Sequence, residues 1–445
     1  MFIGADMLKG KELKYAESLS ALIQTQTVSS NNQTDKSCFY RFHELLKQTF
    51  PKVFSTCELE DFNGSLLLCI RGSGEGLPIL LMNHHDVVEA QGEWRYPAFS
   101  GTIAEGKVWG RGALDTKGGL FCMLQAMEEL LEADFTPKRD VYFVSSCTEE
   151  CQGEGASLVA KTLKERGIKF YFVIDEGGMI INQPIAGAKG RFAMVGTGEK
   201  GCADIKFIAR SNGGHAAMPG KNTPLVRIGK FMAEVERKKL FKAKLSPTVC
   251  RMFSVLSSSM QGPLKHVFKH ARLYSGALSR IVPKVSNTAG AMIKTTVAFT
   301  MAGGSQGINV LPQEAFVIAN MRYSHHQGRD NSIKAITDIA NKYNLETVVL
   351  DPGNESSVCS WNTEGFEFVE SCINKVFPDV KVSPYILNCA SDCRFMDELS
   401  ESCLRFTPFA VDNEQLRSIH GRNENVSTSC LPLAVEFYKS LITEA

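Results

Sequence analysis

The order of apolar and polar positions predicts a chain that alternates between strands and helices over its first 200 residues. Apolar runs at 65–72, 78–86, 140–146 and 169–175 are short and rich in Leu, Ile, Val and Phe, as in buried strands. Between them, apolar residues recur at helical spacing from Leu120 to Leu131 and again over roughly 156–166. This βα alternation predicts a mostly parallel sheet covered by helices.

The pattern changes near residue 197. Alternating strands and helices are then predicted at 201–211, 232–239, 314–324, 331–343 and 346–351. After residue 353 the pattern returns to a helix, a strand and a final helix, at 364–377, 403–409 and 432–442. We therefore expect one α/β domain made of residues 1–196 and 353–445, with a second α/β domain, 197–352, inserted as a lid. Residues 238–300 are basic, and their pattern assigns no clear element.

Length and composition agree with two or more domains, since 445 residues exceed what one compact core normally holds. Lys and Arg (49) balance Asp and Glu (48), so total charge does not indicate a nucleic-acid or membrane partner. The N-terminal residues lack the apolar core of a signal peptide, and no run approaches the roughly 18 residues of a membrane span. We expect a cytoplasmic protein whose fourteen scattered cysteines, without a C-x-x-C pair, are reduced.

Several polar side chains fall at or just after the ends of predicted strands: His84, Asp86, Glu149, Glu150 and Asp175. Ligands of parallel sheets bind beyond the carboxyl ends of the strands. His84 can bind a metal ion through one ring nitrogen while Asp86 accepts a hydrogen bond from the other. His85 alternates to the opposite face of its strand, so we expect it not to be a ligand.

Two further residues complete a candidate metal centre. Asp115 lies in a glycine-rich loop, and its carboxylate can bridge two cations; His420 supplies a second imidazole. The set His84, Asp115, Glu150, Asp175 and His420 then forms two three-ligand sites. Two cations about 3.5–4 Å apart can activate a shared water and polarise a carbonyl.

Each residue has an alternative interpretation. Asp115 could cap the following helix, and Glu149–Glu150 could form a solvated acidic loop. One glutamate of that pair can bind metal while the other takes a proton from the water; Glu176 is the reserve for Asp175. His266 and His270 have the spacing of a helical zinc pair but lack the Glu of H-E-x-x-H.

The motifs H-x-D, G-R-G-x-x-D-x-K-G, E-E-x-x-x-x-G-A and H-x-x-N-E occur in this order along the chain. In this combination the chain resembles the co-catalytic di-zinc hydrolases that include glutamate carboxypeptidase, aminoacylase, carnosinase-type dipeptidases, acetylornithine deacetylase and succinyl-diaminopimelate desuccinylase. The resemblance implies that the five residues above are zinc ligands, with Asp115 bridging. It also implies that Glu149 is the general base, that Asp86 orients His84, and that Asp115–Thr116 is a cis peptide.

The inserted segment resembles the same family. GGHAAMPG matches a motif whose histidine stabilises the oxyanion, often across a dimer interface, which assigns that role to His215. Asn309, Arg322 and Arg394 match residues that hold the substrate's terminal carboxylate, a task that suits the guanidinium fork. The chain departs from the family in having Thr148 before the glutamate pair. Its long 238–300 segment resembles that of the larger carboxypeptidase-type members.

From this we expect a hydrolase that cleaves an amide bond next to a free carboxylate, of dipeptidase or carboxypeptidase type. The alternative is an N-acyl-amino-acid deacylase, and a remote one is a non-catalytic binding member of the fold. Two divalent ions per chain are expected, zinc first, with manganese or cobalt as alternatives. The substrate is a short peptide or small molecule; no nucleic-acid or membrane partner is expected, and a homodimer stays open.

Overall fold

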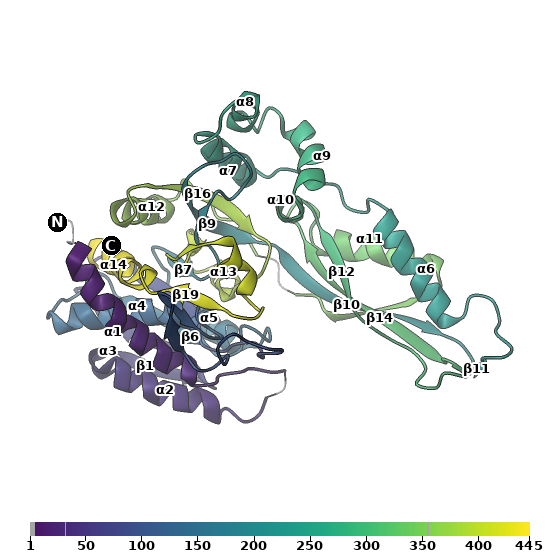
Figure 1. Ribbon diagram of the computed structural model, residues 1–445, viewed down its shortest axis with the longest axis horizontal. Helices are drawn as coiled ribbons and strands as arrows, with labels where there is room; N and C mark the ends of the chain where they lie inside the picture. The colour runs from purple at the N-terminus through teal and green to yellow at the C-terminus, as the bar shows by residue number, and fades with distance from the viewer. Residues whose placement is uncertain (1–4, 32, 354–355) are drawn as a thin grey trace.

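The computed structural model describes residues 5–31, 33–353 and 356–445. Its centre is a large mixed sheet with the strand order β1-β2-β6-β3-β7-β17-β9-β8-β18, and β16 also pairs with β9. The core strands β6, β3, β7 and β17 run parallel to one another, while β1 and β2 add an antiparallel edge. The prediction of a mostly parallel, helix-covered sheet is confirmed (Figure 1).

The strands of the large sheet have short, apolar sequences because most are buried on both faces. Their bounds are β1 Glu58–Phe62, β2 Ser65–Ile70, β3 Ile79–His84, β6 Val141–Ser146, β7 Val173–Asp175, β8 Ile180–Asn182, β9 Arg191–Glu199, β16 Val380–Leu387, β17 Cys403–Arg405 and β18 Ala410–Val411. Every residue of β2, β3 and β6 is buried. Five of these strands, β1, β8, β9, β16 and β18, were not predicted from the sequence.

Helices cover both faces of this sheet. The main apolar core lies between one face and helices that include α1 (Ala5–Gln24), α4 (Lys117–Glu132), α12 (Glu364–Val376) and α14 (Cys430–Glu444). A second core lies on the other face, beneath α5 (Gly155–Glu165) and the short helix η1 (Asp392–Met396). At the edge of the sheet, α2 (Ser37–Thr49) and α3 (Pro51–Thr56) precede β1.

A small sheet joins two loops that are far apart in sequence. Strand β5 (Lys107–Trp109) pairs with β4 (Thr102–Ala104) on one side and with β19 (Asn425–Ser427) on the other. The loop after β5 therefore lies beside the loop that connects α13 (Asn413–Ser418) to β19.

The inserted segment forms an antiparallel sheet with the order β12-β14-β10-β15. These strands are β10 Gly201–Arg210, β12 Thr296–Gly303, β14 Glu314–Tyr323 and β15 Glu346–Asp351, and α6 (Pro224–Arg237) and α11 (Arg329–Lys342) pack on them. Only Lys200 separates β9 of the large sheet from β10 of the small one. Figure 1 shows the small sheet extending from the large one, with the short strands β11 (Gly214–His215) and β13 (Val310–Leu311) at its far end.

Helices form much of the basic segment that the sequence pattern left unassigned: α7 (Pro247–Ser257), α8 (Pro263–Lys269), α9 (Ser275–Val285) and α10 (Asn287–Met292). Their buried residues share an apolar cluster with Phe192 and Met194 of β9 and with Ile386 of β16. These helices thus pack on the large sheet, although the chain enters and leaves them from the small one. The division at residues 196 and 352 stays a prediction.

None of the described helices is long and apolar enough to cross a bilayer.

Candidate functional site

Parallel strands bring the predicted ligands to one edge of the large sheet. His84 ends β3 and pairs with Ser146, the last residue of β6. Asp175 ends β7, which pairs with β3 on one side and β17 on the other. The carboxyl ends of these strands point the same way, so the residues that end or follow them gather at one edge, as the sequence predicts.

Asp115 lies between the two imidazoles. Its Oδ1 is 3.0 Å from His84 Nε2, and its Oδ2 is 3.0 Å from His420 Nε2. His420 Nε2 also lies 2.9 Å from Glu150 Oε2. Each oxygen of Asp115 thus faces a different histidine, which is the arrangement a bridging carboxylate needs.

The donor set fits a divalent cation. One ligand atom each from His84, Asp115 and Glu150 lie within 4.8 Å of one another. Glu150 also has a buried oxygen, Oε1, without a hydrogen-bond partner among the described residues. Imidazole and carboxylate donors with no thiolate suit zinc, manganese or cobalt.

The pKa values reflect this crowding of acids and imidazoles. Hydrogen bonds to Asp115 and Glu150 raise the pKa of His420 to about 10. Burial opposes ionisation of Asp115, but its contacts with His420 and His84 outweigh burial and lower its pKa. Burial, with Asp392, Glu176 and Glu150 nearby, raises the pKa of Glu149 well above its usual range. A site that needs so many charges in one place favours a bound cation.

Asp86 organises more of the site than the sequence indicates. Its Oδ1 is 3.5 Å from His84 Nδ1, although the backbone carbonyl of Asp86 is closer to that nitrogen, at 3.0 Å. The same carboxylate accepts hydrogen bonds from the backbone N–H groups of Glu149 (3.2 Å) and Glu150 (3.1 Å). It therefore fixes the glutamate pair against β3 as well as facing His84.

His85 points away from the site, as strand alternation predicts. It is fully buried, its Nδ1 is 2.8 Å from Ser145 Oγ, and its ring stacks on Phe42.

Glu424 has a positioning role that was not predicted from the sequence. Its Oε1 accepts hydrogen bonds from the backbone N–H groups of Leu114 (2.8 Å) and Asp115 (3.0 Å), and its Oε2 pairs with Arg111 at 2.6 Å. It ties the Asp115 loop to the His420 loop from a fully buried position. The H-x-x-N-E motif contained this residue, but nothing in the spacing gave its partner. The Asp115–Thr116 peptide is cis, as the resemblance implied.

The acid after β7 has two candidates in different environments. Asp175 accepts backbone hydrogen bonds on both oxygens, from Glu176 (2.8 Å) and from Cys393 (2.7 Å). Burial raises the pKa of Glu176 well above its usual range, and repulsion from the negative charges of Asp115 and Glu150 adds to this effect. Asp175 thus anchors the strand end, while Glu176 lies among the clustered acids.

The predicted substrate residues divide into two groups. Arg394 lies near the cluster, with Nη1 donating to Ser391 O (2.8 Å) and 3.8 Å from Glu199, and its positive charge acts on Glu149. Arg322 lies on β14 opposite Cys202, at the end of the small sheet next to the large one.

His215 and Asn309 lie elsewhere. The Asn309 carbonyl accepts a 2.9 Å hydrogen bond from Ala216, so the two residues share the β11–β13 end of the small sheet. Figure 1 shows that end far from the strands carrying the ligands. Within this chain the structure does not bring His215 to the ligand cluster.

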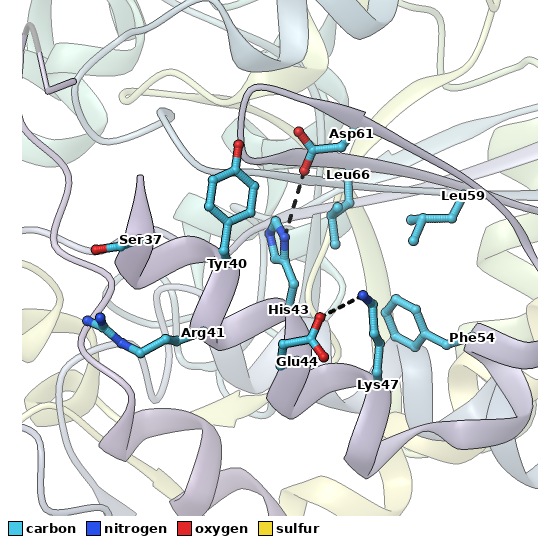
Figure 2. Close-up of a pocket in the computed structure, with 10 residues that line it drawn as sticks. All are labelled: Ser37, Tyr40, Arg41, His43, Glu44, Lys47, Phe54, Leu59, Asp61 and Leu66. Atoms are coloured by element: carbon cyan, nitrogen blue, oxygen red, sulfur yellow. Dashed lines mark hydrogen bonds and ion pairs between the residues drawn. The ribbon is translucent and has the colours of Figure 1, made fainter. Parts of the chain in front are cut away.

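A hollow of about 560 Å³ lies away from this cluster, between α2, α3 and β1. Figure 2 shows His43 at its wall, with Nδ1 3.8 Å from Asp61. It contains none of the predicted site residues. The hollow is therefore separate from the candidate metal centre.

Residues 80–444 match the family described as peptidase family M20/M25/M40. The chain is 32% identical to "Probable carboxypeptidase S-like 2" of Dictyostelium discoideum, covering 91% of this chain and 79% of the relative. It is 31% identical to "N-fatty-acyl-amino acid synthase/hydrolase PM20D1" of Xenopus tropicalis, covering 98% and 86%.

Solved structures share the fold. Human carnosine dipeptidase 1 aligns with a TM-score of 0.71 at 13% identity, over 99% of this chain and 98% of that one. An M20 family metallo-carboxypeptidase of Sulfolobus solfataricus also gives 0.71 at 15% identity, over 96% and 98%. The recognition of the family and of an amide-bond hydrolase is confirmed. The chain belongs to peptidase family M20/M25/M40 and is a metal-dependent hydrolase of amide or peptide bonds.

Proposed function

We propose that this protein uses two divalent ions to hydrolyse an amide bond next to a free carboxylate. The observation that carries the proposal is the position of Asp115, with one oxygen 3.0 Å from His84 and the other 3.0 Å from His420. His84 and His420 would each belong to one ion and Asp115 to both. Glu150 lies on the His420 side of Asp115. When bound, the ions supply an activated water and polarise the scissile carbonyl.

The remaining ligand would come from the acid pair after β7. Asp175 is our first assignment and Glu176 the alternative. Asp175 is held at the strand end by the two backbone hydrogen bonds it accepts, and Glu176 lies close to Asp115. Both residues should therefore be substituted separately and tested for loss of bound metal.

Glu149 would move the protons. Its backbone is held by Asp86, and its raised pKa shows an environment in which the carboxyl group retains a proton readily. It would take a proton from the attacking water and later give it to the leaving amine. Adjacent Glu150 would bind metal, so the two glutamates would divide the tasks of base and ligand.

Arg394, Arg322 and Asn309 would hold the substrate's carboxylate, and His215 would stabilise the oxyanion. The position of Arg394 beside the cluster supports its part. His215 would need closure of the small sheet over the site or a contribution from a second subunit. A homodimer therefore remains part of this proposal, as does a cytoplasmic location.

Two substrate classes fit this chemistry. A dipeptidase or carboxypeptidase activity is our leading candidate, supported by the carboxypeptidase S-like relative. The second candidate is hydrolysis of N-acyl amino acids, supported by the PM20D1 relative, with which this chain aligns over 98% of its length. Both substrate classes present the same carboxylate and differ on the acyl side.

A substrate panel tests the proposal. Purified protein would be incubated with dipeptides and with N-acyl amino acids of short and long chain, each with added zinc, manganese or cobalt. We expect metal-dependent release of a free amino acid from one of the two series. Matched amides that lack the free carboxylate should be poor substrates. Equal cleavage of those amides would contradict the carboxylate requirement.

A further inference from the structure

Charge is segregated along this chain even though its total is balanced. Residues 237–313 contain twelve Lys and Arg but no Asp or Glu. Since the whole chain has a net charge of +1, a segment of +12 leaves −11 on the rest. The middle of this segment forms α8 and α9, at the top of the molecule in Figure 1.

Large apolar side chains are exposed on the same two helices and the turn between them. Leu273 is 79% exposed and Val285 75%, and Leu264 and Ile281 are more than half exposed. On α9, Ile281 and Val285 lie one turn apart, as do Arg280 and Lys284 beside them. The outer face of this helix therefore presents an apolar row next to a basic row.

The basic side chains of this face have no acidic partners among the residues that the structure describes. Lys265, Lys269, Arg272, Arg280 and Lys284 are exposed, and none forms an ion pair with the described residues. Exposed arginines elsewhere do form ion pairs, such as Arg166 with Glu60 at 2.5 Å and Arg71 with Glu58 at 2.6 Å. The positive charge of α8 and α9 is thus directed to the outside.

The inner side of these helices packs on the rest of the protein through buried apolar residues. Leu278 and Val282 of α9 are buried, and Phe268 of α8 stacks on Phe253 of α7 with ring centroids 4.8 Å apart. Helix α7 packs in turn on β16 of the large sheet. The exposed apolar residues are therefore not the missing half of an internal core.

We infer that α8, residues 270–274 and α9 form a docking surface for an anionic lipid bilayer. Unpaired Lys and Arg are attracted to acidic headgroups, while neighbouring Leu, Ile and Val enter the boundary between headgroups and acyl chains. A nucleic acid would match the charge but leave the apolar row in water. The inference does not depend on the proposed hydrolase activity.

Vesicle binding by the full chain tests the surface. The protein would be sedimented with vesicles of phosphatidylcholine alone and with vesicles that also contain phosphatidylserine. We expect binding to the second kind, weakened by added salt because the attraction is screened. Each Lys or Arg contributes roughly a fivefold change in binding, so the double variant Arg272→Glu/Lys284→Glu should lose tenfold or more.

Matched controls separate the surface from general effects. Leu273→Ser/Ile281→Ser should also weaken binding, whereas Leu13→Ser/Leu77→Ser, which removes two exposed leucines elsewhere, should not. Lys14→Glu/Lys161→Glu makes the same change in net charge at exposed positions of α1 and α5, and this variant should bind nearly as the natural protein does. Thermal melting checks that each variant is folded.

Three results would overturn the inference. The first is equal binding of the natural protein to neutral and acidic vesicles. The second is equal losses in the surface and control variants. The third is a change from dimer to monomer in Leu273→Ser/Ile281→Ser with vesicle binding unchanged, which would make this face a subunit contact.

Discussion

Glu149 and Glu150 are neighbours in sequence, but their side chains have different surroundings. Glu150 Oε2 is 2.9 Å from His420, inside the ligand cluster. Glu149 instead lies near Asp392, Glu176 and His84, and burial raises its pKa well above the usual range. This difference supports one residue as a ligand and the other as a proton carrier.

Substituting each glutamate separately tests this division. Glu149→Ala should retain most bound metal and the fold but lose several orders of magnitude in kcat, because base and acid roles both vanish. Glu150→Ala should lose metal. Metal content by elemental analysis and kcat by steady-state kinetics are the measurements; equal metal loss in both variants would reverse the assignment.

The raised pKa values also predict how metal-free protein responds to pH. Burial, with Asp392 close by, raises the pKa of Asp175 to about 7, so the folded state holds a proton that the unfolded state releases near pH 4. This lowers stability as pH rises from about 4 to 7. The contacts that raise the pKa of His420 to about 10 stabilise the fold below about pH 6.5, and that stabilisation is lost as pH rises towards 10.

Both effects have the same sign, so the metal-free protein should melt at a lower temperature at pH 9 than at pH 5. A bound cation compensates the ionised carboxylates, and it binds the deprotonated histidine. The difference in melting temperature between metal-loaded and metal-free protein should therefore widen with pH. A constant difference across this range would count against a metal among these residues.

At the scale of elements, a buried ion pair links β9, the strand from which the chain passes into the small sheet, to the neighbouring strand β17. Glu199 ends β9, is 1% exposed, and lies 3.1 Å from Arg405 of β17. It also accepts hydrogen bonds from the backbone and hydroxyl of Ser391 (3.1 and 2.7 Å), in the loop that leads to Arg394. Glu199 thus connects the end of β9, where the chain passes into the small sheet, with the loop before Arg394, a residue predicted to bind substrate.

Removing one partner leaves an uncompensated buried charge. Glu199→Ala should lower the free energy of unfolding by about 3–5 kcal/mol. Glu60→Ala, which removes an exposed partner of Arg166, is the matched control and should cost less than about 1 kcal/mol. Urea unfolding measures both, and similar small losses would show that the Glu199 pair is not structurally important.

Which elements the sequence predicts depends on their surroundings. The strands β2, β3, β6 and β7 are apolar on both faces and were readily predicted. The polar residues at or just after the ends of β3, β6 and β7 stood out in the sequence for the same reason, and they remain the candidate ligands. Strand β16 was missed because its apolar pattern is interrupted by an exposed lysine, Lys381, and by a buried proline, Pro384. The helices of 247–292 were missed because their exposed apolar residues blur the helical period.

Long-range contacts explain what else the sequence did not predict. The pairing of Glu424 with the Asp115 loop spans about 310 residues, and no local pattern encodes it. The same holds for the backbone hydrogen bonds from Glu149 and Glu150 to Asp86. Motif order indicated which residues meet, but the residues that hold them in place required the structure.

For the whole molecule, the role proposed for His215 depends on its distance from the candidate metal centre. It lies at the far end of the small sheet, exposed, in a short strand paired with β13 (Figure 1). A rigid sheet cannot reach the site without a large movement or a second subunit. The proposed catalytic role of His215 therefore requires domain closure or assembly of two subunits.

Mixing two inactive variants distinguishes these routes. His215→Ala should lower kcat far more than it weakens substrate binding, because an oxyanion donor acts in the transition state. If His215 acts across an interface, mixing His215→Ala with Glu149→Ala protein should restore one working site per mixed dimer. If activity stays absent despite proven subunit exchange, His215 acts at the site of its own chain. If His215→Ala has the kcat of the natural protein, His215 takes no part in the mechanism.

The most direct measurement is the metal content of the gently purified protein, taken together with its metal-dependent activity. We predict about two divalent ions per chain, loss of hydrolysis on removal by a chelator, and recovery on adding zinc, manganese or cobalt. Protein that holds no transition metal, and that gains no activity when one is supplied, would contradict the two-metal site around Asp115.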